Sequence, residues 1–177
     1  SIALGGGTLA SGFNSTATGN NTIATGAFST AMGSFTIASG HTSMAMGFST
    51  TASGSSATAT GQSTDASGDF SMAMGHLSNA SGTYSLATGK STDATGHAAT
   101  ATGDSSLASG AVSFASGFRT TASGDFSTAM GNYASTNNQN GSFVIGDNST
   151  STVMNSPALN NFRARFANGY RLYTSAD

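Results

Sequence analysis

The side chains best able to do chemistry in this sequence are three histidines and seven aspartates. The chain has no cysteine and every acidic residue is an aspartate. His41, His76 and His97 each directly follow a glycine, at separations of 35 and 21 residues. Catalysis and metal binding both require such groups to converge on one point. Whether these residues converge depends on the elements that carry them.

A seven-residue phrase repeats without interruption from Ser1 to about Ala134. Nineteen glycines stand seven residues apart, and an alanine lies two residues before each of them. A coiled coil is excluded, because it needs large apolar residues at two heptad positions and loses ~1 kcal/mol for each internal glycine. Ser, Thr, Ala and Gly occupy alternate positions, which is the period of a β-strand. Each phrase is therefore predicted to be one short strand closed by a glycine turn. The predicted turn glycines include Gly5, Gly12, Gly47, Gly75 and Gly131.

Two kinds of phrase alternate, so the true repeat has fourteen residues. In one kind the variable positions are mainly Met, Phe, Leu and Thr, and in the other they are mainly Ser, Thr and Asp. Fourteen residues with two short strands form one coil of a parallel β-solenoid that rises ~4.8 Å per coil. Because the inner positions hold only small side chains, the two sheets must lie closer than the usual ~10 Å. The predicted fold is all-β, a β-roll of 14-residue coils with a small C-terminal β-hairpin.

The apolar variable positions form a stripe along one face of this roll. A slab with a small-residue interior buries little apolar area, and an exposed apolar stripe favours association. We therefore expect the stripe to face copies of the same chain in a closed, symmetric homotrimer. The residues predicted at this interface are Phe28, Met32, Met44, Met46, Phe70, Met72, Met74, Leu86, Phe114 and Met130.

Segments such as Ser1–Gly5, Ser43–Gly47 and Ser85–Gly89 resemble the S-x-A-x-G repeats of the YadA-like head of trimeric autotransporter adhesins. The resemblance covers roughly residues 1–146. It implies a left-handed parallel β-roll, three chains side by side, and display on a bacterial surface for attachment to host matrix, cells or abiotic surfaces. It also implies anchoring in the outer membrane through a region absent from this chain, and a role in virulence. Ser1 begins in mid-repeat, so the chain is expected to be part of a longer fibre.

The sequence predicts three segments. Residues 1–134 form the head repeats, residues 135–158 form a cap or transition with one last strand, and residues 159–177 form a hairpin leading to a further module. Asn168-Gly169 between two alternating runs is a strong hairpin signal. Arg163, Arg165 and Arg171 are expected to solvate the outer face of this hairpin, with a basic contact patch as the alternative.

No cofactor, metal or catalytic residue is predicted. In a solenoid, His41 and His97 share one edge ~19 Å apart and His76 lies on the opposite edge, so one chain cannot place them on one metal. Pairing of histidines between chains is the alternative. The phrase lacks the calcium-binding G-G-x-G-x-D pattern, and a net charge of −2 argues against nucleic acid.

The predicted function is non-enzymatic adhesion by a stiff, multivalent head. The alternative is a shaft or receptor-binding segment of a phage or injection-device tail fibre, which the C-terminal hairpin supports. An ice-binding solenoid would need a regular Thr lattice, which the mixed polar face does not provide. Phe13, Phe48 and Phe118 follow glycines and are expected to pack across the junction between chains, with ligand contact as the alternative.

Overall fold

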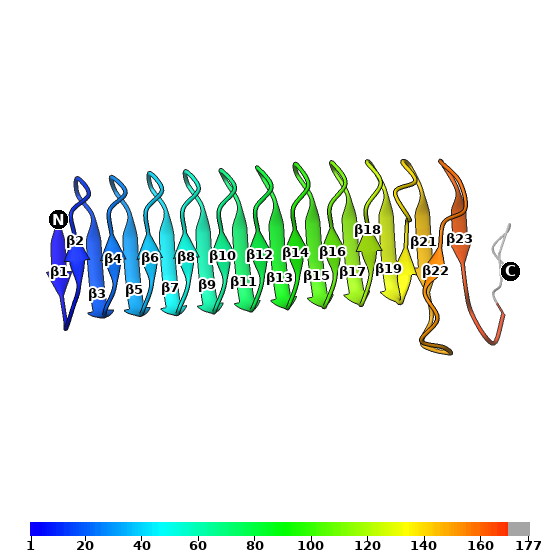
Figure 1. The fold of residues 1–177 in the computed structure, drawn as a ribbon, viewed down its shortest axis with the longest axis horizontal. Coiled ribbons are helices and arrows are strands. Elements are labelled where there is room, and N and C mark those ends of the chain that lie inside the picture. The colour runs from blue at the N-terminus through cyan, green and yellow to red at the C-terminus, as the bar shows by residue number, and fades with distance from the viewer. Residues whose placement is uncertain (170–177) are drawn as a thin grey trace, which may run out of the picture.

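The computed structural model of the chain describes residues 1–169 as a straight parallel β-solenoid, in which each coil contributes one strand to each of two sheets (Figure 1). Strands with odd numbers form a 12-stranded sheet, here called sheet A, and strands with even numbers form an 11-stranded sheet, sheet B. Every pairing is parallel. The predicted coil of fourteen residues with two short strands is confirmed.

Sheet A carries the longer strands. They are β1 (Ile2–Leu4), β3 (Thr16–Asn20), β5 (Thr30–Ser34), β7 (Met44–Phe48), β9 (Thr58–Gln62), β11 (Met72–His76), β13 (Leu86–Lys90), β15 (Thr100–Asp104), β17 (Phe114–Phe118), β19 (Thr128–Asn132), β21 (Phe143–Gly146) and β23 (Phe162–Ala164). Sheet B consists of two-residue strands. They are β2 (Leu9–Ala10), β4 (Ile23–Ala24), β6 (Ile37–Ala38), β8 (Thr51–Ala52), β10 (Asp65–Ala66), β12 (Asn79–Ala80), β14 (Asp93–Ala94), β16 (Leu107–Ala108), β18 (Thr121–Ala122), β20 (Ala134–Ser135) and β22 (Met154–Asn155).

The interior is built from columns of identical small residues. Ala45 pairs with Ala59 in sheet A and Ala52 pairs with Ala66 in sheet B, and all four are fully buried. Buried Ser and Thr complete the interior, and Val144 is its largest fully buried side chain. Side chains of this size allow two packed sheets to approach closely.

The glycines allow neighbouring coils to lie close together. A Cβ on Gly47 would lie 2.0 Å from the carbonyl oxygen of Gly61 in the next coil. Gly47, with φ +120°, is inside β7 rather than in a turn, and Gly75 and Gly131 lie likewise inside β11 and β19. The predicted strand-ending role is therefore wrong for these three, whereas Gly12 does lie in the turn between β2 and β3.

The sharp change of direction occurs instead at the second residue after each glycine. Phe28 and Arg119 have φ of 60° and 51°, in the left-handed region that disfavours residues with a Cβ. Backbone bonds between coils hold these turns in place, because the Phe28 N–H donates to the Phe13 carbonyl at 2.7 Å and the Arg119 N–H to the Asp104 carbonyl at 2.9 Å. We call the turns leading from sheet B into sheet A the upper edge, and those leading from sheet A into sheet B the lower edge (Figure 1).

The ladder continues beyond residue 134. Strand β21 pairs with β19, and β23 pairs in parallel with β21 through Phe143 and Phe162. The first arm of the predicted C-terminal hairpin is thus a strand of the solenoid. It pairs with β21 because Phe162 and Ala164 repeat the apolar alternation of Phe143 and Ile145. The second arm and Arg171 lie outside the described residues. None of residues 1–169 forms a helix that is long and apolar enough to cross a membrane.

Candidate interaction surface

Ahead of the glycine in each strand, the outer face of sheet A carries two columns of side chains, and neither contains a charged residue between β1 and β23. The strand residue after the glycine, such as Lys90 of β13 or Asp104 of β15, belongs to the lower edge. The first column holds Ile, Thr, Met, Leu and Phe, and the second holds Leu, Thr, Met, Ser, Ile and Ala. Met32 and Met72 are 44% and 40% exposed. A regular, uncharged surface with large exposed apolar side chains is the kind of face that proteins cover by association. We refer to it as the A face.

Strand pairing places the methionines next to one another on this face. Met32 is the register partner of Met46, and Met44 lies beside Met46 on β7. Thr58 and Thr60 of β9 then separate this cluster from Met72 and Met74 on β11. The A face is therefore an alternation of Met clusters and Thr rungs, so its apolar area is distributed along the rod.

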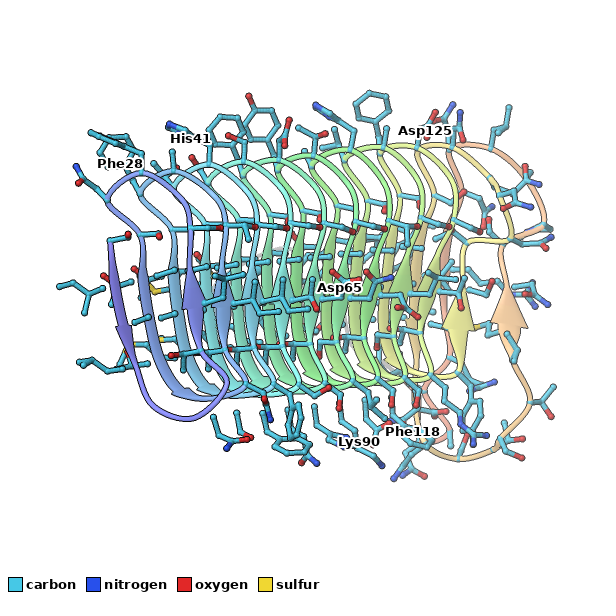
Figure 2. All side chains as sticks on the ribbon, turned by 60° about the vertical axis from the view of Figure 1, so that its left-hand side comes forward. Phe28, His41, Asp65, Lys90, Phe118 and Asp125 are labelled. Carbon is cyan, nitrogen blue, oxygen red and sulfur yellow. The ribbon has the colours of Figure 1, made fainter. Side chains whose placement is uncertain are left out.

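The structure places eight of the ten residues predicted to contact other copies on the A face. They are Met32, Met44, Met46, Met72, Met74, Leu86, Phe114 and Met130. Phe28 (Figure 2) and Phe70 lie elsewhere, in upper-edge turns with φ of 60° and 57°. Side chains alternate between the inner and outer face only within a strand. Phe28 and Phe70 precede their strands, so an even spacing from the methionines does not place them on the A face.

The outer face of sheet B differs in chemistry along its length. Its central column contains Ile23 and Ile37 near the N-terminal end, but Asp65 (Figure 2), Asn79 and Asp93 follow in the middle. Ser and Thr fill the neighbouring column. Carboxylates in a contact between copies would lose hydration without a partner, so this face is better suited to water than to self-association.

Aromatic rings contact one another along the upper edge, mostly edge to face, with Phe70 and Tyr84 stacked. The ring centroids of Phe13 and Phe28 are 5.5 Å apart, and those of Phe28 and His41 are 5.7 Å apart. A second group joins Phe70 to Tyr84 at 5.1 Å, and Tyr84 to His97 at 5.7 Å. Each contact joins successive coils, because the paired residues are 13 to 15 positions apart in the sequence. They leave much of each ring exposed.

Two aspartates of the upper edge also hold the coils together. The Asp69 carboxylate accepts a 2.8 Å hydrogen bond from the Ser55 N–H, and the Asp125 carboxylate accepts one of 2.8 Å from the Ala111 N–H. In both cases the acceptor belongs to the next coil at the equivalent turn position. Each aspartate thereby satisfies a turn N–H that would otherwise face solvent.

The lower edge carries both cations of the repeat region. Lys90 Nζ lies 3.3 Å from Asp104 Oδ2. The Ser105 hydroxyl and the Lys90 ammonium both lower the pKa of Asp104. The Arg119 guanidinium lies over the Phe118 and Tyr133 rings, 5.3 and 5.7 Å from their centroids. Such cation–π contacts hold a charged side chain against an aromatic surface.

The histidines lie where the repeat predicts them. His41 (Figure 2) and His97 are in upper-edge turns, and His76 ends β11 at the lower edge. In residues 1–169, no three His, Asp, Glu or Cys side chains are grouped as they would be around a metal ion.

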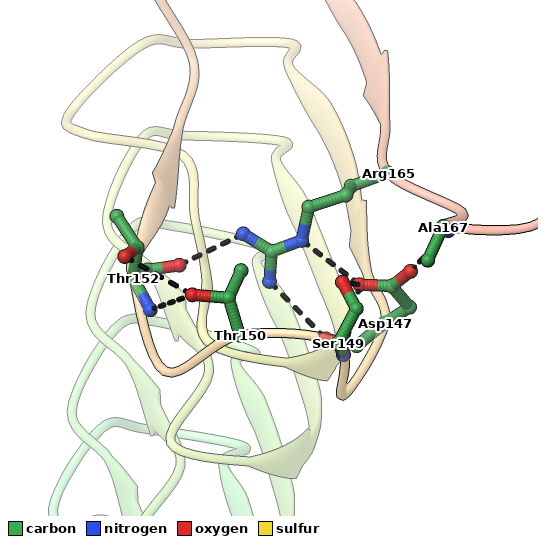
Figure 3. A network of polar contacts seen from close by, with 6 residues as sticks. All are labelled: Asp147, Ser149, Thr150, Thr152, Arg165 and Ala167. Carbon is green, nitrogen blue, oxygen red and sulfur yellow. Dashed lines mark hydrogen bonds and ion pairs between the residues drawn. The ribbon is translucent and has the colours of Figure 1, made fainter.

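Polar contacts hold the C-terminal end of the described chain (Figure 3). Arg165 Nε is 2.9 Å from Asp147 Oδ1, and the same guanidinium donates to the Thr152 and Asp147 carbonyls at 2.8 and 3.1 Å. Asp147 also accepts hydrogen bonds from the Ser149 hydroxyl and the Ala167 N–H, each at 2.6 Å. Together with Arg165, these donors lower the pKa of Asp147 to about 2. We call this group the Asp147–Arg165 clasp, which no sequence motif predicts.

A β-solenoid with a Ser, Thr and Ala interior, an uncharged A face and glycine-spaced coils defines a class of repetitive, elongated fibre segments. The sequence places the chain in one family of that class: the YadA head domain repeat (2 copies) matches residues 10–36, 38–64, 66–92, 94–113 and 108–134, and the chain belongs to this family. Heads of this family are surface-exposed parts of autotransporter adhesins, form trimers and are generally non-enzymatic. No curated protein sequence matches the chain.

Proposed function

We propose that this chain is the head segment of a trimeric bacterial surface adhesin, in which three parallel copies pack their A faces around a common axis. The observation that carries the proposal is the absence of charge from both columns of the A face through twelve strands. In an isolated chain, the methionines of the A face would be exposed to water. Packing three copies around it gives the thin slab the apolar core that its own interior lacks.

The proposed activity is attachment without catalysis. With the A faces covered, the outer face of sheet B remains to contact an external surface. Identical contacts repeated along each rod and tripled by symmetry bind by multivalency, so no deep pocket is required. The tail-fibre alternative rests on the predicted C-terminal hairpin. The first arm of that hairpin is a solenoid strand that pairs in parallel with β21, so this support is weakened.

Two measurements test the proposal. Light scattering coupled to size exclusion should give three times the chain mass of 17.3 kDa. A stable monomer would contradict the trimer. Beads that carry the chain should then adhere to reconstituted extracellular matrix, cultured cells or bare glass more strongly than beads that carry a monomeric variant. If the two kinds of bead were retained equally on each of the three surfaces, adhesion by a multivalent head would be contradicted.

A further inference from the structure

The two edges of the slab differ in charge and both expose aromatic rings. In residues 1–134 the upper edge carries two carboxylates, Asp69 and Asp125, and no Lys or Arg. The lower edge carries the two cations, Lys90 and Arg119, with one carboxylate at Asp104. On the upper edge Phe28 and Phe126 are 50% and 69% exposed, and on the lower edge Phe35 and Phe48 are 51% and 49% exposed.

The repeat puts specific residues of the two edges at the same height along the rod. One coil advances ~4.8 Å for fourteen residues, so residues seven positions apart lie on opposite edges with an axial offset of only ~2.4 Å. By this rule Phe28 is level with Phe35, and His41 with Phe48. Near the other end, Asp125 is level with Phe118, and Phe126 with Arg119. Aromatic and charged groups of the two edges therefore coincide in height at both ends of the repeat region.

Closed cyclic symmetry makes this coincidence meaningful. A rotation without translation brings together surfaces at the same height on neighbouring copies. If three A faces surround the axis, the upper edge of one copy meets the lower edge of the next at each corner of the assembly. We propose that the edges form this second contact between copies, an inference that rests on the proposed trimer. The A faces form its centre, and the edge residues fix the angle and height at which neighbouring copies meet.

The chemistry at each end fits a contact between copies. At the N-terminal end, the Phe28–His41 pair faces the Phe35–Phe48 pair, whose ring centroids are 5.9 Å apart. At the other end, Arg119 is held over Phe118 and Tyr133, level with Asp125 on the neighbouring copy. Asp125 uses Oδ1 for the Ala111 N–H, and its second carboxylate oxygen is free of hydrogen bonds within residues 1–169. The aromatic rings give the junction apolar area, and a guanidinium and a carboxylate at one height give it charge complementarity.

Cysteine cross-linking tests the inference, because the chain has no cysteine of its own. The test variant carries His41→Cys and Phe48→Cys, and is treated with a short bismaleimide. Within one chain these positions are on opposite edges, roughly 20 Å apart by the rise of an extended strand. Between neighbouring copies they are level. We expect most chains to run as covalent dimers and trimers on a denaturing gel.

The matched control replaces His41→Cys by His97→Cys and keeps Phe48→Cys. His97 has the same turn position as His41 four coils further on, so its axial offset from Phe48 is about 17 Å. This control should cross-link at least tenfold less. A second pair, Phe118→Cys with Asp125→Cys, repeats the test at the other end, and Phe118→Cys with Asp69→Cys is its offset control. Light scattering on each variant checks that it remains trimeric.

The outcomes separate the inference from the proposed function. Cross-links in a level pair and not in its offset control support the edge contact. A trimer in which level pairs cross-link no better than offset pairs overturns the edge contact and leaves the proposed function standing. A wild-type monomer overturns both. If one level pair disrupts the trimer, the pair at the opposite end decides the result.

Discussion

The hydroxyl of Thr92 donates a 3.0 Å hydrogen bond to the hydroxyl of Ser78, one coil away in the interior of the solenoid. Ser78 in turn donates to the Gly89 carbonyl at 3.1 Å. Thr50 occupies an equivalent buried position, but the neighbouring coils place Thr there as well, and its hydroxyl has no partner. One column of the interior therefore contains both satisfied and unsatisfied hydroxyls, and the two should respond differently to the same substitution.

We predict that Thr92→Val lowers the free energy of unfolding by about 1 kcal/mol, because a buried hydrogen bond is lost at nearly constant volume. Thr50→Val should leave it unchanged or raise it by about 1 kcal/mol, because a buried hydroxyl without a partner is replaced by a methyl group. Thermal unfolding at one protein concentration compares the two. Equal losses in both variants would show that the Thr50 hydroxyl is satisfied in solution.

Gly47→Ala should destabilise the solenoid by about 3 kcal/mol or more. The new Cβ would meet the Gly61 carbonyl oxygen at 2.0 Å, and alanine disfavours a φ of +120°. Gly6→Ala is the control, because its Cβ would be 3.6 Å from Asn20 Nδ2, in ordinary contact. Circular dichroism during heating measures both. A Gly47→Ala variant as stable as the control would mean that the coils can separate without loss.

The Asp147–Arg165 clasp should open in acid. The pKa of Asp147 is lowered to about 2, by the Ser149 hydroxyl first and then by the Ala167 N–H and Arg165. A carboxyl with a lowered pKa stabilises the closed form above its ordinary pKa of 3.8, and this stabilisation is lost as pH falls from about 4 through about 2.

Amide hydrogen exchange at Ala167 measures the opening. Exchange corrected for its intrinsic pH dependence should be slow at pH 6 and increase as pH falls toward 2. Asp147→Asn should show fast exchange throughout this range, and Asp93→Asn, a change on the outer face of sheet B, should behave like the wild type. Protection at pH 2 equal to that at pH 6 would show that the carboxylate does not hold the clasp.

Charge on the A face should prevent assembly. Met46→Asp combined with Met74→Asp would place two carboxylates of each copy in the proposed centre of the trimer, where unpaired charges are costly. We expect this variant to be monomeric, at 17.3 kDa by light scattering. Thr51→Asp adds a carboxylate to the outer face of sheet B and should leave the trimer intact. Trimers of equal strength in both variants would mean that the A face is not the contact.

The repeat made the register of the fold predictable. Ala45 and Ala59 are fourteen residues apart and become partners in sheet A, as do Gly47 and Gly61. One residue of slip would place a larger side chain in the interior, where only small ones fit. Fixed spacing thus determined the ladder, and the same spacing places His41 and His97 on the upper edge and His76 on the lower edge.

Details of the turns could not be predicted from alternation. Phe28 follows the strand parity of Met32, yet its left-handed φ turns its side chain to the upper edge. Asn14 and Asn21 lie at the equivalent position of other repeats and indicate a left-handed φ there, since asparagine tolerates this conformation better than phenylalanine. At the C-terminal end, the Asn168-Gly169 signal favoured a hairpin, but stacking of Phe162 on Phe143 at 5.6 Å accompanies parallel pairing with β21.

The ladder bonds of this solenoid point along the rod, in the direction in which a pulled fibre is loaded. One coil occupies ~4.8 Å of rod, whereas fourteen residues drawn out to full length span roughly 46 to 50 Å. Each coil that opens therefore becomes about ten times as long as it is when folded. Since the coils are nearly identical, they should yield one after another at similar force, so that a stretched head lengthens in equal steps and dissipates work before its attachment breaks.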